Sequence, residues 1–234
     1  KMIAQLKSGE ITNGEANNDY LSNFNQEKAM EGYKALAKKK VSVTPTLIGG
    51  KQLAYLDEND HKTDDFLDFL SDRFTANYAW RIGRMANDTP AQKQQRKDRY
   101  QLIAKQLPYL QKAGINIMAG SDAAALNTFV YPALSLHEEL VLFQDAGLTP
   151  LQILQSATIN GAKFMGTLDA MSTISVGKMA NLVILNSNPL EDIRATLDIE
   201  SVFNQGEYLN RSALDTILEK AKQTKLALDQ QRNK

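Results

Sequence analysis

The sequence of 234 residues contains no cysteine and has no excess charge of either sign. The lack of cysteine excludes thiol catalysis and cysteine zinc sites, while it leaves oxidising and reducing compartments equally open. Lysine and arginine together number 27, as do aspartate and glutamate, and no block of like charge forms a basic arm or an acidic tail. These properties disfavour a nucleic-acid partner.

The sequence also lacks an apolar run near the length of a membrane span, and its first 30 residues are polar where a signal peptide needs an apolar centre. We therefore expect no membrane association and a soluble chain, in the cytoplasm or in a periplasmic or secreted location. Because the chain starts at Lys1 followed by Met2, we also expect that an upstream segment was removed. The length suffices for one large domain with a sizeable core.

The first part of the chain predicts helices and one strand. Asn25 is a typical cap for an amphipathic helix over 26–39. The β-branched residues that follow predict a strand over 41–44 that ends in a loop at Pro45. Apolar positions at helical spacing predict one or two helices over 63–86.

A second helix–strand unit follows. Thr89 and Pro90 are start signals for a helix that tolerates or kinks at Pro108 and ends at Gly114. The short apolar segment 115–119 then predicts a strand covered on both faces. Helix, glycine, strand and a polar residue at the end of the strand are typical of repeated units in a parallel sheet or barrel.

The pattern changes towards the C-terminus, where short strands replace helices. Helices are predicted over 133–146, from Thr149-Pro150, and from Thr158 to Met165. Beyond them the sequence predicts strands over 173–176 and 181–185, a hairpin over 202–209, and a final helix capped by Ser212 with Asp215 that runs to about Asp229.

The triplet Gly120-Ser121-Asp122 and the motifs after it resemble the end of the catalytic barrel in the amidohydrolase superfamily, in particular its imidazolonepropionase-like and dipeptidase-like members. Residues 43–47 resemble the seventh strand of that barrel. Further motifs occur in the order of the family, namely His137-Glu138-Glu139-Leu140, Ala146-Gly147-Leu148-Thr149-Pro150, Ala157-Thr158-Ile159-Asn160-Gly161-Ala162-Lys163, the segment 177–185 and Asn188-Pro189-Leu190.

The resemblance implies an α/β fold in two parts. Residues 1–170 correspond to the C-terminal portion of a (β/α)8 TIM-type barrel, here incomplete, with its last strand–helix units. Residues 171–234 correspond to strands of a small β-sandwich and a terminal helix. The implied activity is metal-dependent hydrolysis of amide-type C–N bonds, in a cyclic amide or a small peptide. The implied cofactor is a divalent metal, with zinc as the first candidate.

Three residues are the candidates for that chemistry. An aspartate at the carboxyl end of a barrel strand lies on the face where active sites form, and the resemblance assigns Asp122 as both metal ligand and catalytic proton acceptor. His137 either hydrogen-bonds a backbone group as a partly buried histidine or, by resemblance, orients a carboxylate or a substrate group. Thr44 is the second candidate for substrate binding, because it lies where a strand meets its loop.

The sequence departs from the family in its ligands. Family members use a His-x-His pair and further strand-end histidines, whereas this chain contains only His61 and His137. Asp122 and standard partners do not supply the three or four ligands of a zinc site. The alternative interpretation is therefore a non-catalytic fragment or module, which pairs with the missing N-terminal part of the barrel or with another copy of the chain. Asn181 also stands where the family commonly has aspartate.

Further residues have ordinary interpretations. The polar surroundings of His61 predict a solvated loop residue. The aromatic residues between Phe66 and Trp80 are typical of core or lid packing rather than of a ligand site. Phe129 and Tyr131 follow Asp122 in its loop, where they either pack or lie over a substrate.

Overall fold

A short parallel sheet organises the computed structural model, which describes residues 2–124 and 126–232. Strand β1 (Ser42–Val43) pairs with β2 (Asn116–Ile117), with Val43 opposite Ile117. The chain between the two strands crosses over through helices, as a parallel pair requires. The predicted α/β class is confirmed, and both strands form inside the predicted ranges, although each is shorter than expected.

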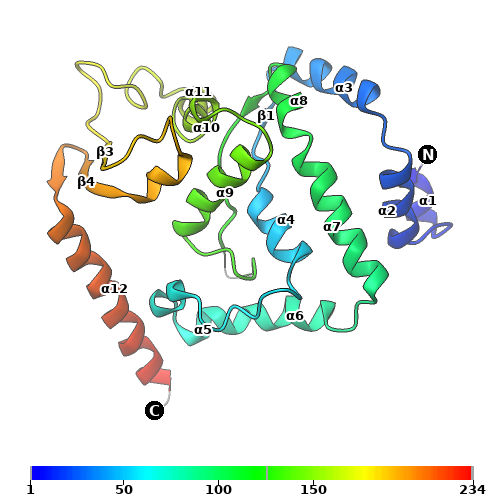
Figure 1. Cartoon of the computed structure of the whole chain (residues 1–234), viewed down its shortest axis with the longest axis horizontal. Helices are drawn as coiled ribbons and strands as arrows, with labels where there is room; N and C mark the ends of the chain where they lie inside the picture. Colours follow the sequence, from blue (N-terminus) through cyan, green and yellow to red (C-terminus); the bar gives the residue numbers. More distant parts are fainter. Residues whose placement is uncertain (1, 125, 233–234) are drawn as a thin grey trace.

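Helices surround this pair of strands. In Figure 1, α4 and α9 lie at the centre, α7 runs along one side, and α5 and α6 cross below them. The helices are α1 (Met2–Ser8), α2 (Asn13–Ser22), α3 (Gln26–Lys38), α4 (Leu47–Ala54), η1 (Asp65–Phe69), α5 (Asp72–Thr75), η2 (Ala76–Tyr78), α6 (Ala79–Met85), α7 (Pro90–Ala104), α8 (Leu107–Lys112), α9 (Leu134–Asp145), α10 (Pro150–Ser156), α11 (Ile159–Met165), η3 (Ile193–Leu197) and α12 (Arg211–Arg232).

Several helices begin where local sequence signals place them. The Asn25 side chain accepts a hydrogen bond from a backbone N–H in the first turn of α3. Thr89 and Gln92 form a reciprocal capping box at the start of α7, and Thr149 and Gln152 form another at α10. These caps satisfy backbone donors that have no partner inside the helix, which explains why the local sequence determines the starting residue.

Of the two alternatives for Pro108, the kink is confirmed. The helix divides into α7 and α8, because Pro108 lacks an N–H and lies in the first turn of α8. The cap predicted at Thr158 needs correction. Thr158 does not cap α11, since its hydroxyl donates to the Leu154 carbonyl at 2.7 Å.

The start of α12 also differs from the prediction. The Asn210 side chain, rather than Ser212, accepts the hydrogen bond from the Ala213 N–H, at 2.9 Å. Asp215 pairs instead with Arg211, at 2.8 Å. The helix then extends to Arg232 and contacts η1, where Lys222 pairs with Asp68 at 3.0 Å.

An antiparallel sheet occupies the C-terminal region, in the order β3 (Leu182–Leu185), β4 (Ile199–Asn204) and β5 (Glu207–Leu209). The predicted hairpin is confirmed, because Gln205 and Gly206 both adopt positive φ between β4 and β5, as tight hairpin turns require. The Asn181 side chain accepts a hydrogen bond from the Gln205 N–H at 2.7 Å. Asn181 therefore has a structural role in holding this turn.

The strand predicted over 173–176 is wrong. This segment has no strand conformation in the structure, and Ile174 is 89% exposed. The β-branched residues favour an extended backbone, but a strand forms only when a neighbour supplies hydrogen bonds, and no described strand pairs with this segment. The loop is held by its ends, where the Met179 N–H donates to the Ala170 carbonyl at 2.9 Å.

The main core lies between the parallel strands, α4 and α9. Its most buried members include Leu107, Ile117, Phe143, Ile153 and Ile193. Ile193 comes from η3, which packs against α9. The C-terminal region therefore shares this core with the helices. The division at residue 170 stays a prediction.

A second core cluster is aromatic. Tyr78, Phe129 and Tyr131 are buried together, with Phe66 and Phe74 packed against them. The prediction that aromatic residues of the 66–80 segment pack in a core is therefore confirmed for these members, although Trp80 is 40% exposed. None of the helices in the described parts of the chain is long and apolar enough to cross a membrane.

The carboxyl ends of β1 and β2 approach each other closely at Gly120. A Cβ atom placed on Gly120 lies 2.7 Å from the Thr44 Cγ2 atom, so a side chain at this position forces one strand end to move. Beyond β2, the Ala119 N–H donates to the Ser156 carbonyl at 3.0 Å, which ties the same strand end to α10. Glycine is therefore required where the two strand ends meet.

We expect Gly120→Ala to lower the free energy of unfolding by about 1–3 kcal/mol, because the new methyl group overpacks the contact with Thr44. Thr44→Ser removes the Cγ2 atom, so the double variant should recover most of this loss. Urea denaturation followed by circular dichroism measures both effects. Gly32→Ala in α3 is the matched control, because its Cβ meets no atom within 4 Å, and it should stabilise by up to about 1 kcal/mol. Equal stability of Gly120→Ala and the double variant would contradict the proposed clash.

Candidate functional site

Asp122 lies at the edge formed by the carboxyl ends of the two parallel strands. It follows β2, has a positive φ of 53° and is exposed. The Asn127 side chain donates to the Asp122 carboxylate Oδ2 atom at 2.9 Å and accepts from the Arg81 guanidinium at 3.2 Å. Thr44, also exposed, reaches the same edge through its contact with Gly120. The structure thus places Thr44 beside Gly120, two residues before Asp122.

The described residues do not fit a complete metal site. Across 2–124 and 126–232 no group of three or more histidine, aspartate or glutamate side chains is arranged to hold a metal ion. Within this part of the chain, Asp122 therefore belongs to no set of three or more such side chains. A zinc site needs three protein ligands even when it keeps an open position.

His137 lies at the junction of α9 and η3. Its Nδ1 atom is 3.0 Å from the Thr196 hydroxyl, which itself donates to the Ile193 carbonyl at 2.9 Å. Because that hydroxyl proton is already used, His137 Nδ1 is the donor in the pair. Burial lowers the pKa of His137, which favours the neutral ring. The substrate-binding role of His137 stays a prediction.

Glu139 was not predicted from the sequence to have a role of its own. Its side chain is fully buried, and its two carboxylate oxygens accept the Leu47 and Ile48 N–H groups at 2.8 and 2.7 Å. These N–H groups begin α4, whose own cap residue, Thr46, makes no side-chain cap bond. Burial raises the pKa of Glu139 to about 7, and the two backbone hydrogen bonds oppose this rise only in part.

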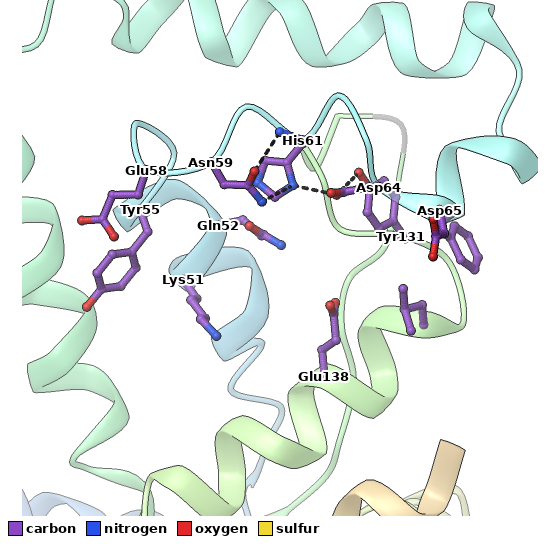
Figure 2. A pocket seen from close by; sticks show the side chains of 12 residues that line it. Lys51, Gln52, Tyr55, Glu58, Asn59, His61, Asp64, Asp65, Tyr131 and Glu138 are labelled. Carbon is purple, nitrogen blue, oxygen red and sulfur yellow. Dashed lines mark hydrogen bonds and ion pairs between the residues drawn. The ribbon is translucent and has the colours of Figure 1, made fainter. Parts of the chain in front are cut away.

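A cleft of about 660 Å³ opens between α4, the segment that leads into η1, and α9. Figure 2 shows that Lys51 and Gln52 of α4, His61 and Asp64 of the connecting loop, and Glu138 of α9 surround it. The Gln52 side chain donates to the Phe129 carbonyl at 3.2 Å, which attaches the loop after Asp122 to α4. The cleft is therefore built from the segments that follow both parallel strands.

The prediction that His61 is a solvated loop residue is wrong. His61 is only 7% exposed and has a positive φ of 55°. Its ring stacks on Phe129 with centroids 4.0 Å apart, and its Nδ1 atom lies 2.7 Å from the Asp64 carboxylate. Polar sequence neighbours suggested exposure, whereas Phe129, which is distant in sequence, covers the ring. The His-x-x-Asp spacing was the local signal that could have indicated the pair.

Tyr131 completes this arrangement. Its hydroxyl donates to the same Asp64 Oδ2 atom at 2.7 Å, and its ring is buried against Phe66. Burial and the nearby Asp64 raise the pKa of the Tyr131 hydroxyl, which therefore stays protonated. Phe129 and Tyr131 are thus both packed in the aromatic cluster, and Tyr131 also lines the cleft.

Glu138 supplies a second carboxylate to the cleft. Its Oε2 atom is buried and has no hydrogen-bond partner among the residues that the structure describes. Burial raises the pKa of Glu138, whereas the positive charge of Lys51 lowers it. A buried carboxylate oxygen without a donor is costly, since removal from water is not compensated.

Comparison with known proteins places these features in a family. The Amidohydrolase family matches residues 8–209. A 5-methylthioadenosine/S-adenosylhomocysteine deaminase from Teredinibacter turnerae is 31% identical over 87 residues, which are 35% of this chain and 20% of the deaminase. An S-triazine hydrolase from Gordonia rubripertincta is 27% identical over 110 residues, which are 42% of this chain and 23% of that protein.

Solved structures show the same fold. A prolidase complexed with N-methylphosphonate-L-proline has a TM-score of 0.54 and 22% identity, over 78% of this chain and 38% of the prolidase. A bottromycin amidohydrolase has a TM-score of 0.59 and 17% identity, over 77% of this chain and 38% of that protein. At these identities the likeness concerns the fold alone.

The parallel strands with their surrounding helices define an α/β chain of the same fold as these amidohydrolases. Since the family match covers most of its length, the chain belongs to the Amidohydrolase family. The membership expected from the motifs around Asp122 is confirmed. The chain spans about a fifth of the length of the curated relatives that it matches.

The buried Glu139 carboxylate should make stability depend on pH. The folded-state pKa of Glu139, about 7, lies above the unfolded value near 4.5. The contribution of Glu139 to the free energy of unfolding is therefore complete below pH 4.5 and is lost as pH rises through 7. Relative to Glu139→Gln, which cannot ionise, the wild type should lose about 3 kcal/mol of unfolding free energy between pH 4.5 and pH 8. Urea denaturation across this range gives the difference.

Glu31→Gln is the control for this measurement, because Glu31 is exposed on α3 and its substitution should leave the pH dependence of the wild type unchanged. If Glu139→Gln shows the same pH dependence as the wild type, the raised pKa of Glu139 is refuted.

Proposed function

We propose that the whole protein hydrolyses amide-type C–N bonds, in a cyclic amide or a small peptide, with Asp122 as its active-site aspartate. The position of Asp122 carries the proposal, because it is an exposed carboxylate at the carboxyl end of a parallel strand in an Amidohydrolase family chain. The names of the similar proteins are consistent with C–N bond hydrolysis, since they include a deaminase, a triazine hydrolase and a prolidase.

In this proposal Asp122 accepts a proton from the attacking water. A carboxylate serves this purpose when it is accessible and held in one orientation. The hydrogen bond from Asn127 to its Oδ2 atom restrains the carboxylate, and Arg81 restrains Asn127 in turn. Thr44, on the neighbouring strand end, is the proposed contact for substrate at the same edge.

The proposed enzyme also uses a divalent metal, with zinc as the first candidate. The described residues do not complete a site for it, so Asp122 contributes one ligand and the others come from elsewhere. Two sources are proposed for them, the N-terminal part of a barrel and a second copy of this chain. Both would also cover the open edges of the two-stranded sheet.

A second candidate function is a non-catalytic module. The dispersed arrangement of histidine and carboxylate side chains in the described residues favours it for the chain as it stands. Exposed apolar side chains on α11 and β3, namely Phe164, Met165 and Val183, suit a chain that pairs with another polypeptide.

We expect Asp122→Asn to lower kcat/KM of the whole protein by about 100-fold or more, because the amide cannot accept the proton. Hydrolysis of a panel of dipeptides and cyclic amides measures turnover, and mass spectrometry measures bound zinc. Asp169→Asn is the matched control, because Asp169 is an exposed aspartate in the segment after α11, and it should behave as the wild type.

Turnover that survives Asp122→Asn refutes the assignment of Asp122. Assays on the chain alone separate the two candidate functions. Stoichiometric zinc in the chain alone, with turnover that Asp122→Asn abolishes, refutes the non-catalytic module.

A further inference from the structure

The carboxylates that line the cleft differ in whether they have hydrogen-bond donors or ion-pair partners. Asp64 Oδ2 accepts from both His61 and Tyr131, each at 2.7 Å. Glu58 pairs with Lys97 of α7. Glu138 differs, because its buried Oε2 atom has no donor among the described residues. The cleft is therefore lined by a carboxylate, Glu138, one oxygen of which no described residue satisfies.

A positive charge lies in the same cleft. Lys51 extends from α4 and Glu138 from α9, and Figure 2 shows both side chains directed into the same opening. Within the described residues they form no ion pair, so each charge is available to a ligand that lies between them. The opening of about 660 Å³ is large enough for a small organic molecule.

The side chains that line the cleft favour an ammonium group over a metal ion as the ligand. A metal ion does not suit the cleft, because the described histidine and carboxylate side chains form no group of three ligands and His61 Nδ1 is held by Asp64. An ammonium group suits Glu138, since it supplies N–H donors and a compensating charge. Apolar surface from Phe66, Leu134 and Tyr55 is present in the same cleft and can cover an apolar side chain.

We propose that this cleft binds a small zwitterion, an amino acid with an apolar side chain, whose ammonium group donates to Glu138 and whose carboxylate lies towards Lys51. The site is built in advance, because the His61–Asp64–Tyr131 contacts and the His61–Phe129 stack hold one wall of the cleft in place. The inference does not rest on the proposed hydrolysis, since binding is measured without turnover.

Isothermal titration with three matched ligands tests the proposal on the full chain. L-leucine carries both charges, 3-methylbutylamine keeps only the ammonium group, and 4-methylpentanoate keeps only the carboxylate. L-leucine should bind most tightly, the amine more weakly, and the acid not measurably. Glu138→Gln should weaken L-leucine and the amine by about tenfold or more, because the charge-assisted hydrogen bond is lost.

Lys51→Met should weaken L-leucine and leave the amine unchanged, because only L-leucine has a carboxylate. Glu31→Gln, on the distant α3, should bind all three ligands as the wild type does. Thermal unfolding shows whether each variant is folded. Glu138→Gln should keep or raise the melting temperature, since it removes a charge from a side chain whose buried Oε2 atom has no partner among the described residues.

Three outcomes overturn the proposal. The first is that L-leucine fails to bind at millimolar concentration, and the second is that it binds Glu138→Gln as tightly as the wild type. The third is that the amine binds as tightly as L-leucine while Lys51→Met changes neither affinity, which would leave an amine site and exclude the zwitterion. Failure of hydrolysis in the whole protein with retained binding of L-leucine would refute only the proposed function.

Discussion

The contact between Glu139 and the start of α4 is the constraint on which the rest of the structure depends. Helix α4 begins directly after β1, and α9 follows β2, so this carboxylate joins the two strand–helix units across the core. It takes the place of a local cap, because Thr46 provides none. The cost is a buried carboxyl group with a pKa raised to about 7, which the two backbone N–H groups offset only in part.

This contact also determines where the functional groups lie. Lys51 and Gln52 are positioned by α4, and Glu138, the residue before Glu139, is positioned by α9. Glu139 therefore connects the two helices that contribute Lys51 and Glu138 to the cleft. Asp122 belongs to the same arrangement, because its loop continues to Phe129, whose carbonyl accepts from Gln52 and whose ring covers His61. The loop after Asp122 thus contacts two residues of the cleft wall, Gln52 and His61.

The sequence predicted features whose physical cause is local. The caps at Asn25, Thr89 and Thr149 were correct, because each side chain bonds a backbone N–H within its own first turn. The hairpin around Gly206 was correct for a similar reason, since its turn requires positive φ. The strand expected over 173–176 was wrong, because strand formation depends on a partner that local pattern does not reveal. His61 was misjudged because its cover comes from Phe129, far along the chain.

The sequence by itself determined the α/β class, the family and the position of Asp122 after a buried strand, since these depend on periodicity and on motif order along the chain. Only the tertiary structure decided which carboxylate oxygens receive hydrogen bonds. Glu138 and Glu139 are adjacent in sequence and chemically identical. Glu139 caps α4 from the core, whereas Glu138 lines a cleft and its Oε2 atom has no donor among the described residues. The physical reason is the helical geometry of α9, which directs consecutive side chains to different faces of the helix and hence to different partners.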